Sequence, residues 1–144
     1  MRRSFHYLRS APSRTSRALR WAIATMAKIE QALWSSDPDR VLEGEIAKAV
    51  VGDLVDFNRK VGPNGATGEV DVETTKAIIE VTTRRTGKLK QIQKLLSHPD
   101  MNPSGKSVIL FAPNYGRSAT EDIINAGAIV VRTQEELLSV LAIL

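Results

Sequence analysis

An unbroken run of apolar residues from Val108 to Ala112 is the feature that most narrows the folds open to this chain. A strand covered on one face alternates apolar and polar side chains, whereas a strand buried on both faces is apolar throughout. The run therefore predicts a central strand over residues 107–112, in a sheet with helices on both faces.

The segments around this strand alternate in type. Helical spacing over residues 89–96 and 121–126 predicts two helices, and residues 128–131 predict a second buried strand. A closing helix is expected over residues 134–144. Helices that alternate with strands indicate parallel crossover connections. We therefore predict an α/β fold with a mixed central sheet flanked by helices.

Two further helices are expected before the sheet. The first begins after Ser13 or Ser16 and has apolar residues at helical spacing as far as Leu33. The second follows Pro38 and is predicted over residues 39–60, with an inward stripe that includes Leu54 and Phe57. Residues 61–68 are rich in Gly, Pro and Asn and predict a loop. This pattern divides the chain into a basic helical N-terminal segment, residues 1–36, and a second domain, residues 37–144.

Residues 69–73 and 76–83 predict a β-hairpin that carries two acids. Because side chains alternate along a strand, Val70 and Val72 can face the core while Asp71 faces the other way. Glu80 has the same relation to its apolar neighbours. Paired strands lie about 4.8 Å apart, so Asp71 and Glu80 can converge on one cation. The alternative is that both acids line a solvated face of the sheet.

The second predicted helix supplies a third acid, Glu43, which falls on its apolar face. An acid among core-facing residues needs a partner, and a metal ion or its water ligand would serve. A salt bridge or a place at the edge of the stripe would also account for Glu43. The choice between Glu43 and Glu45 remains open at this stage.

Composition restricts the chemistry. The chain has no cysteine and 2 histidines, which excludes thiol chemistry and zinc–thiolate sites. A metal would be a hard cation with oxygen ligands, Mg²⁺ or Mn²⁺. No apolar run approaches the roughly 20 residues needed to cross a bilayer. The net charge of +4 mildly favours polyanionic partners.

The basic residues form two clusters. The first precedes Glu30 and is Arg- and Ser-rich, which is typical of a transit peptide or of a folded or partner-docking arm; it consists of Arg2, Arg3, Arg9, Arg14, Arg17, Arg20 and Lys28. The second follows the strand of Glu80 and consists of Arg84, Arg85, Lys88, Lys90 and Lys94. Either cluster could be a solvated face, but the second is also placed to bind nucleic acid.

The arrangement resembles the PD-(D/E)XK nuclease superfamily, in which a helix with a glutamate precedes a strand with an aspartate and a strand that ends in Glu-x-Lys. Glu43, Asp71 and Glu80 match these acids in order, over residues 39–131. The resemblance implies a restriction-endonuclease-like fold. It also implies metal ligation by Asp71, Glu80 and the carbonyl of Val81, with Glu43 binding the cation directly or through water.

One position departs from the family pattern, because Thr82 stands where the lysine is expected. Lys88 or Lys90 could take that lysine's place and offset the charge that develops on the phosphate, and Gln91 is a further polar candidate. Arg84, Arg85 and Lys94 would bind the nucleic-acid backbone. If neither lysine reaches the site, the expectation is a domain that binds nucleic acid without cutting it.

The chain is also similar to the C-terminal nuclease toxin domains of bacterial contact-dependent growth inhibition proteins. That resemblance implies a substrate of tRNA or DNA, with tRNA favoured, and a cognate immunity protein with an acidic surface. It implies action in the bacterial cytoplasm, including that of a target cell after delivery as part of a larger secreted protein.

Three alternatives remain from other classes. They are a DNA-repair or Holliday-junction nuclease, a non-catalytic nucleic-acid-binding module, and an α/β ligand-binding domain whose acids are only solvated. The sequence leaves open the cleavage position, the metal, the oligomeric state, and whether the chain is part of a larger protein.

Overall fold

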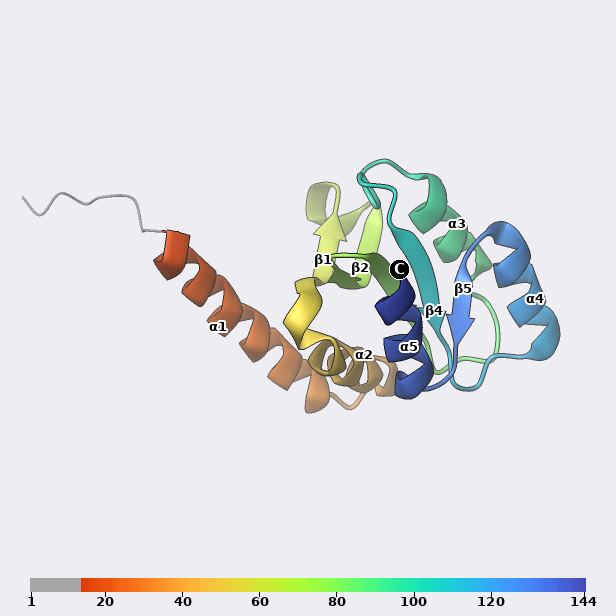
Figure 1. Cartoon of the computed structure of the whole chain (residues 1–144), viewed down its shortest axis with the longest axis horizontal. Helices are drawn as coiled ribbons and strands as arrows, with labels where there is room; N and C mark the ends of the chain where they lie inside the picture. The colour runs from red at the N-terminus through yellow and green to blue at the C-terminus, as the bar shows by residue number, and fades with distance from the viewer. Residues whose placement is uncertain (1–13) are drawn as a thin grey trace, which may run out of the picture.

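The computed structural model describes residues 14–144 of the chain, and Figure 1 shows how they are arranged. Ser13, Arg2, Arg3 and Arg9, which entered the predictions above, lie outside this range. The helices are α1 (Arg14–Leu33), α2 (Pro38–Ala49), α3 (Leu89–Ser97), α4 (Arg117–Ala126) and α5 (Gln134–Ile143). The strands are β1 (Leu54–Val61), β2 (Gly68–Thr74), β3 (Ala77–Val81), β4 (Ser107–Phe111) and β5 (Ile129–Val131), with short 3₁₀ turns η1 (Val51–Asp53) and η2 (Pro63–Gly65).

The sheet has five strands in the order β1-β2-β3-β4-β5. β1, β2 and β3 are antiparallel to one another, whereas β3, β4 and β5 run parallel. The predicted mixed sheet is therefore confirmed, as is the hairpin of β2 and β3. Its turn is closed by the hydroxyl of Thr74, which accepts hydrogen bonds from the backbone N–H groups of Lys76 and Ala77 at 3.1 and 3.0 Å.

Helices cover both faces of the sheet, and each face has its own core cluster. One cluster combines strand residues with α1, α2 and α5, and the other combines them with α3 and α4 (Figure 1). β4 contributes to both, because Ile109 and Phe111 belong to the first cluster while Val108 and Leu110 belong to the second. This two-sided burial is the physical reason for the unbroken apolar run.

The prediction of a helix over residues 39–60 is wrong beyond residue 49. The helix ends at Ala49, and Leu54–Val61 form β1 instead, an edge strand paired with β2. The spacing of Leu54 and Phe57 fits a helix as well as a strand that is buried at intervals. The strand is favoured over the helix because it pairs with β2. If residues 54–61 were helical, the backbone N–H and C=O groups along that edge of β2 would lack these hydrogen-bond partners.

β1 and β2 form the outer hairpin of the sheet, and their side chains pack against different core clusters on either side of Asn58, which has a left-handed φ of 53°. On one side of this point the paired residues Phe57 and Val72 belong to the core cluster under α2 and α5. Beyond it, Val70 packs in the cluster under α3 and α4. The prediction that Val70 and Val72 face one common core is therefore wrong, because the two residues pack in different core clusters.

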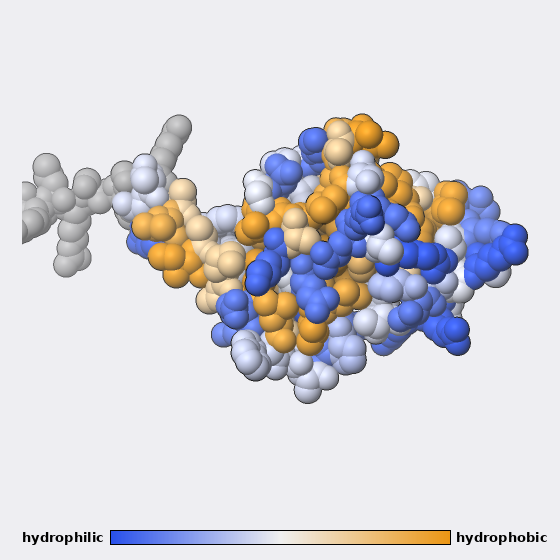
Figure 2. All heavy atoms as spheres, turned by 60° about the horizontal axis from the view of Figure 1, so that its bottom comes forward, coloured by the Kyte–Doolittle hydropathy of each residue, from blue (hydrophilic) through white to orange (hydrophobic). Residues whose placement is uncertain are grey.

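α1 is attached to the domain by its C-terminal half. Ile29 and Ala32 are fully buried in the first core cluster, whereas Leu19, Ile23 and Met26 are exposed. Figures 1 and 2 show this helix projecting from the body, with apolar side chains at its surface. No helix within residues 14–144 is long and apolar enough to cross a membrane.

Candidate metal centre

Asp71 lies in the middle of β2, between Val70 and Val72, which pack in different core clusters. The backbone N–H of Val81 on β3 donates a hydrogen bond of 2.9 Å to Oδ2 of Asp71. The residue is 7% exposed, so this bond orients a carboxylate that is largely withdrawn from solvent. Asp71 is thus positioned by the strand pairing that the sequence predicted.

Glu43 on α2 and Glu69 on β2 converge on Asp71. Carboxylate oxygens of the three residues lie within 4.8 Å of one another. Glu43 is buried and lies close enough to Asp71 for a hydrogen bond between the two side chains. Glu45, the alternative acid, is exposed beside Lys48 and Gln134, so the structure brings Glu43, and not Glu45, to the other carboxylates.

Glu80 approaches Asp71 from β3. It is 3% exposed, and its Oε1 lies 3.5 Å from Nζ of Lys88. Its Oε2 is buried without a hydrogen-bond partner among the described residues. Gln91 on α3 also interacts with Glu80, and it donates a hydrogen bond of 3.1 Å from Nε2 to the carbonyl of Glu69.

The electrostatics of this group oppose full ionisation. Burial, followed by the nearby charge of Asp71, raises the pKa of Glu43 to about 9. Burial and then Asp71 also raise the pKa of Glu69, although Arg40 and Lys60 act in the opposite direction. The pKa of Glu80 is raised well above its usual range by burial and by Asp71, and Lys88 only partly offsets this. Without a cation, the cluster retains protons.

These residues fit a hard divalent cation. All the donors are carboxylate oxygens, which Mg²⁺ and Mn²⁺ prefer. Mg²⁺ ligands at about 2.0–2.1 Å from the ion lie roughly 3 Å apart when adjacent and about 4 Å apart when opposite. Both separations fall within the 4.8 Å that bounds the distances between carboxylate oxygens in this cluster. The unpartnered Oε2 of Glu80 is a further oxygen that a cation or its water ligand could satisfy.

The predicted lysines occupy different surroundings. Lys88 contacts Glu80 and precedes α3, whereas exposed Lys90 lines a separate pocket with Tyr115 and Asp122. The structure therefore brings Lys88, but not Lys90, to the carboxylates. Thr82, at the expected lysine position, is fully buried, and its hydroxyl accepts a hydrogen bond of 3.0 Å from the N–H of Arg84.

The predicted nucleic-acid-binding residues are exposed but dispersed. Arg84 lies near enough to Asp39, at the start of α2, to stabilise its charge. Arg85 lines a hollow with Asn114 and Arg132. Lys94, on α3, donates a hydrogen bond of 2.8 Å from Nζ to the carbonyl of Thr67. Arg84 shares this position with Lys88, because the positive charges of both side chains act on Asp39.

Asp39 joins α2 to the segment that follows β3. Burial favours its protonated form, but hydrogen bonds from Thr83, followed by the charges of Lys88 and Arg84, leave the pKa of Asp39 lowered. Its Oδ1 accepts bonds of 2.7 Å from the N–H and 2.6 Å from the hydroxyl of Thr83. This link fixes the helix of Glu43 relative to the strand of Glu80.

Glu69 is the member of the cluster that the sequence analysis missed. Its spacing from Asp71 could have indicated it, because Glu69, Asp71 and Glu73 occupy alternate positions of one strand. Spacing alone could not separate them, since Glu73 is paired with Lys106 at 2.7 Å and with Arg59 at 3.2 Å. Only the approach of α2 distinguishes Glu69 as a neighbour of Glu43.

The fold and the carboxylate cluster define the molecule as an α/β protein with a mixed five-stranded sheet and a buried acidic site. Comparison with protein-family models, with curated proteins and with solved structures gives no match.

Proposed function

We propose that the protein is a metal-dependent nuclease that hydrolyses phosphodiester bonds of nucleic acid. The observation that carries the proposal is the convergence of buried Glu43 and Asp71 with half-buried Glu69, beside Glu80 and its partner Lys88. Four acids on three elements oppose one another's ionisation, and a divalent cation removes that cost. This sequence order of acids is also the one that resembles the PD-(D/E)XK superfamily.

Each residue has a role that follows from its place. Asp71, Glu43 and Glu69 are the candidate ligands of Mg²⁺ or Mn²⁺, and Glu80 would bind the cation or orient its water ligand. Such a cation, when bound, polarises the phosphate and activates water. Lys88, with its ammonium group 3.5 Å from Glu80, is placed to offset charge that develops on the phosphate. Hydrolysis adds water to phosphorus and releases one sugar oxygen, which takes up a proton.

The biological role that we propose is that of a bacterial contact-dependent inhibition toxin, with tRNA favoured over DNA as substrate. The net charge of +4 suits a polyanionic substrate and an immunity protein with an acidic surface. Its site of action would be the cytoplasm of a target cell. This role rests on the resemblance of the sequence, and the choice of substrate is its direct test.

Thr82 favours a second candidate, a module that binds nucleic acid without cleaving it. The residue is fully buried and hydrogen-bonded within its own turn, so it cannot replace a lysine that contacts phosphate. This candidate holds if Lys88 serves only to neutralise Glu80.

The deciding experiment incubates the purified protein with total tRNA and with plasmid DNA, in Mg²⁺, in Mn²⁺ and in EDTA. Asp71→Asn removes the central ligand with little change in shape, and Asp122→Asn, at an exposed acid of α4, is the matched control. We expect metal-dependent cleavage that Asp71→Asn abolishes and Asp122→Asn preserves. Intact substrates under every condition would reject the nuclease in favour of the binding module.

A further inference from the structure

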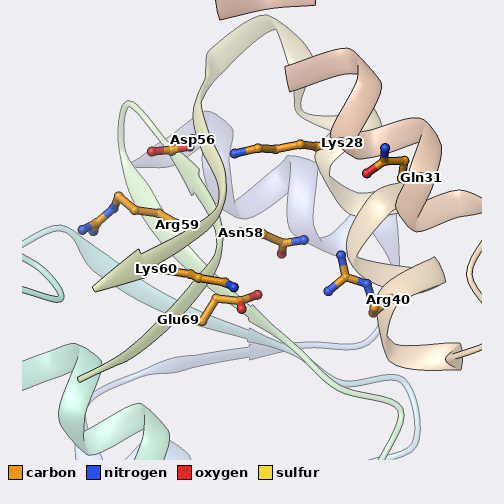
Figure 3. A pocket seen from close by; sticks show the side chains of 8 residues that line it. All are labelled: Lys28, Gln31, Arg40, Asp56, Asn58, Arg59, Lys60 and Glu69. Carbon is orange, nitrogen blue, oxygen red and sulfur yellow. The ribbon is translucent and has the colours of Figure 1, made fainter. Parts of the chain in front are cut away.

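A second feature adjoins the carboxylates, a pocket of about 490 Å³ between the first two helices and the outer hairpin (Figure 3). Its lining comes from α1, α2, β1 and β2, and consists of Lys28, Gln31, Arg40, Asp56, Asn58, Arg59, Lys60 and Glu69. Glu69 belongs both to this lining and to the metal-binding cluster. The pocket and the candidate metal centre are therefore neighbours that share Glu69.

Three cations of the pocket have no direct partner. The side chains of Lys28, Arg40 and Lys60 make no hydrogen bond or salt bridge within residues 14–144, and all three residues are exposed. Arg59 differs, because it is engaged by Glu73 and by the carbonyl of Met101. Asp56 and Glu69 are the acids of the same lining, so its four cations, with Arg59 included, outnumber its acids by two. This excess of positive charge favours an anion in the hollow.

The same cations act on the metal centre. Arg40 lies close enough to Glu43 and Glu69 to influence both carboxylates, and Lys60, which is paired with Glu69 across β1 and β2, influences Glu69. Neither forms an ion pair with those acids within 4.0 Å. Their charges therefore stay available to an incoming anion beside the carboxylates.

Asn58 adds a polar group between the cations. Its carboxamide extends from β1 into the region between Lys28 and Arg40 (Figure 3). The residue has a left-handed φ of 53°, which asparagine tolerates better than most residues, and its Oδ1 is buried without a partner in the described chain. A backbone strained in this way places an amide, rather than an apolar side chain, at the pocket.

We propose that this pocket binds a phosphate group of the nucleic-acid strand adjacent to the phosphodiester held at the carboxylates. The proposal rests on the proposed nuclease function and specifies its substrate path. The four acids would repel an approaching polyanion unless cations lie beside the acids. Lys28, Arg40 and Lys60 are such cations, in the pocket next to Glu69. Lys88, which contacts Glu80, and Arg84, which acts with it on Asp39, are further cations near the carboxylates.

This path gives α1 a part in substrate binding. Lys28 and Gln31 lie on the half of α1 whose Ile29 and Ala32 are buried against the domain, so the helix presents them from a fixed support. The basic N-terminal segment would then contribute directly to the nucleic-acid-binding surface, in addition to any role in joining the domain to other parts of a protein.

The test measures binding of a fluorescein-labelled single-stranded RNA, and of the same sequence as DNA, by anisotropy in EDTA at several salt concentrations. Lys28→Ala, Arg40→Ala and Lys60→Ala are compared with Lys48→Ala, which removes an exposed cation from α2 outside the pocket. Each pocket variant should weaken binding by roughly 5-fold and reduce the slope of log K against log salt by about 0.7. Lys48→Ala should leave both unchanged.

The triple pocket variant should reduce the slope by about 2. Equal binding by the wild-type, Lys48→Ala and pocket variants would overturn the pocket assignment and leave the nuclease proposal to the cleavage assay. Absence of any wild-type binding would also overturn the pocket, while metal-dependent cleavage that fails only in Asp71→Asn would still support the nuclease. Thermal melts of each variant establish that the fold is intact.

Discussion

The backbone N–H of Val81 donates a 2.9 Å hydrogen bond to Oδ2 of Asp71, which ties the central acid of the site to the neighbouring strand. Because the donor is a main-chain group within a sheet, the carboxylate has a fixed direction before any ligand binds. Glu43 approaches Asp71 from α2, Glu80 from β3, and Glu69 from two residues earlier on β2 itself. Preorganised carboxylates of this kind are what a hard cation requires, and the predictions below test their consequences.

The first prediction separates Glu43 from Glu45. Glu43→Gln should weaken binding of Mn²⁺ by at least about 10-fold, because it removes a candidate ligand. It should also raise the melting temperature of the metal-free protein at pH 8, because folding then no longer requires this acid, which is ionised in the unfolded chain at that pH, to take up a proton beside Asp71. Calorimetric titration and thermal melts measure the two effects. Glu45→Gln, at an exposed position of the same helix, should change neither, and a similar response of both variants would contradict the assigned site.

The second prediction concerns the two candidate lysines. Lys88→Ala should lower kcat for metal-dependent cleavage by about 100-fold, because the ammonium group beside Glu80 is lost from the reacting phosphate. Lys90→Ala should leave kcat nearly unchanged, since Lys90 lines another pocket. Single-turnover cleavage rates at saturating protein give the comparison. Should Lys90→Ala cause the larger loss, the role assigned to Lys88 would be wrong.

The third prediction is a pH dependence of stability. The pKa of Glu43 is about 9 in the folded metal-free protein and 4.5 for a solvated glutamate of an unfolded chain, so the folded state binds this proton more tightly. Its stabilising effect is complete below about 4.5 and is lost as the pH rises toward about 9. The melting temperature in EDTA should therefore fall between pH 6 and pH 8, by roughly 5 °C.

Two comparisons make that result specific. Glu43→Gln should flatten the pH dependence, because the titrating group is gone. Addition of Mn²⁺ to the wild type should raise the melting temperature most at pH 8, where metal binding competes with the fewest protons. A wild-type melting temperature that rises between pH 6 and pH 8 in EDTA would be inconsistent with the raised pKa of Glu43.

The fourth prediction tests the attachment of α1. Ile29→Ala should lower the free energy of unfolding by about 2–5 kcal/mol, because Ile29 is fully buried against the domain. Ile23→Ala, one and a half turns earlier in the same helix, should change it by less than about 0.5 kcal/mol, because Ile23 is 62% exposed. Urea unfolding of the two variants gives the difference. Equal effects would mean that α1 does not pack on the domain as described.

Much of the fold could be predicted because its signals are local. The apolar run that became β4 and the alternation of the following helices and strands determine a covered parallel arrangement without reference to other segments. The same is true of the hairpin that carries Asp71 and Glu80, where short strands are separated by a turn closed by Thr74. The burial of Glu43 was indicated by its position on the apolar face of one helix.

The errors arose where spacing was ambiguous. Leu54 and Phe57 fit an inward helical stripe, and the edge strand β1 became evident only from its pairing with β2. The change of face between Val70 and Val72 could not be foreseen, because it breaks the regular alternation that sequence spacing assumes. For the same reason Val70 and Val72 were assigned to one core, although they pack in two.

The α/β class and the order of the acids could be predicted from the sequence alone, because each depends on residue type and short-range periodicity. The tertiary structure decided that Glu69 joins the cluster, that Lys88 rather than Lys90 reaches Glu80, and that Lys28 of α1 faces the same region as Arg40 of α2. These relations depend on how helices pack across a twisted sheet. No local pattern encodes which side chains meet there, because their distances are set by the packing of segments far apart in the chain.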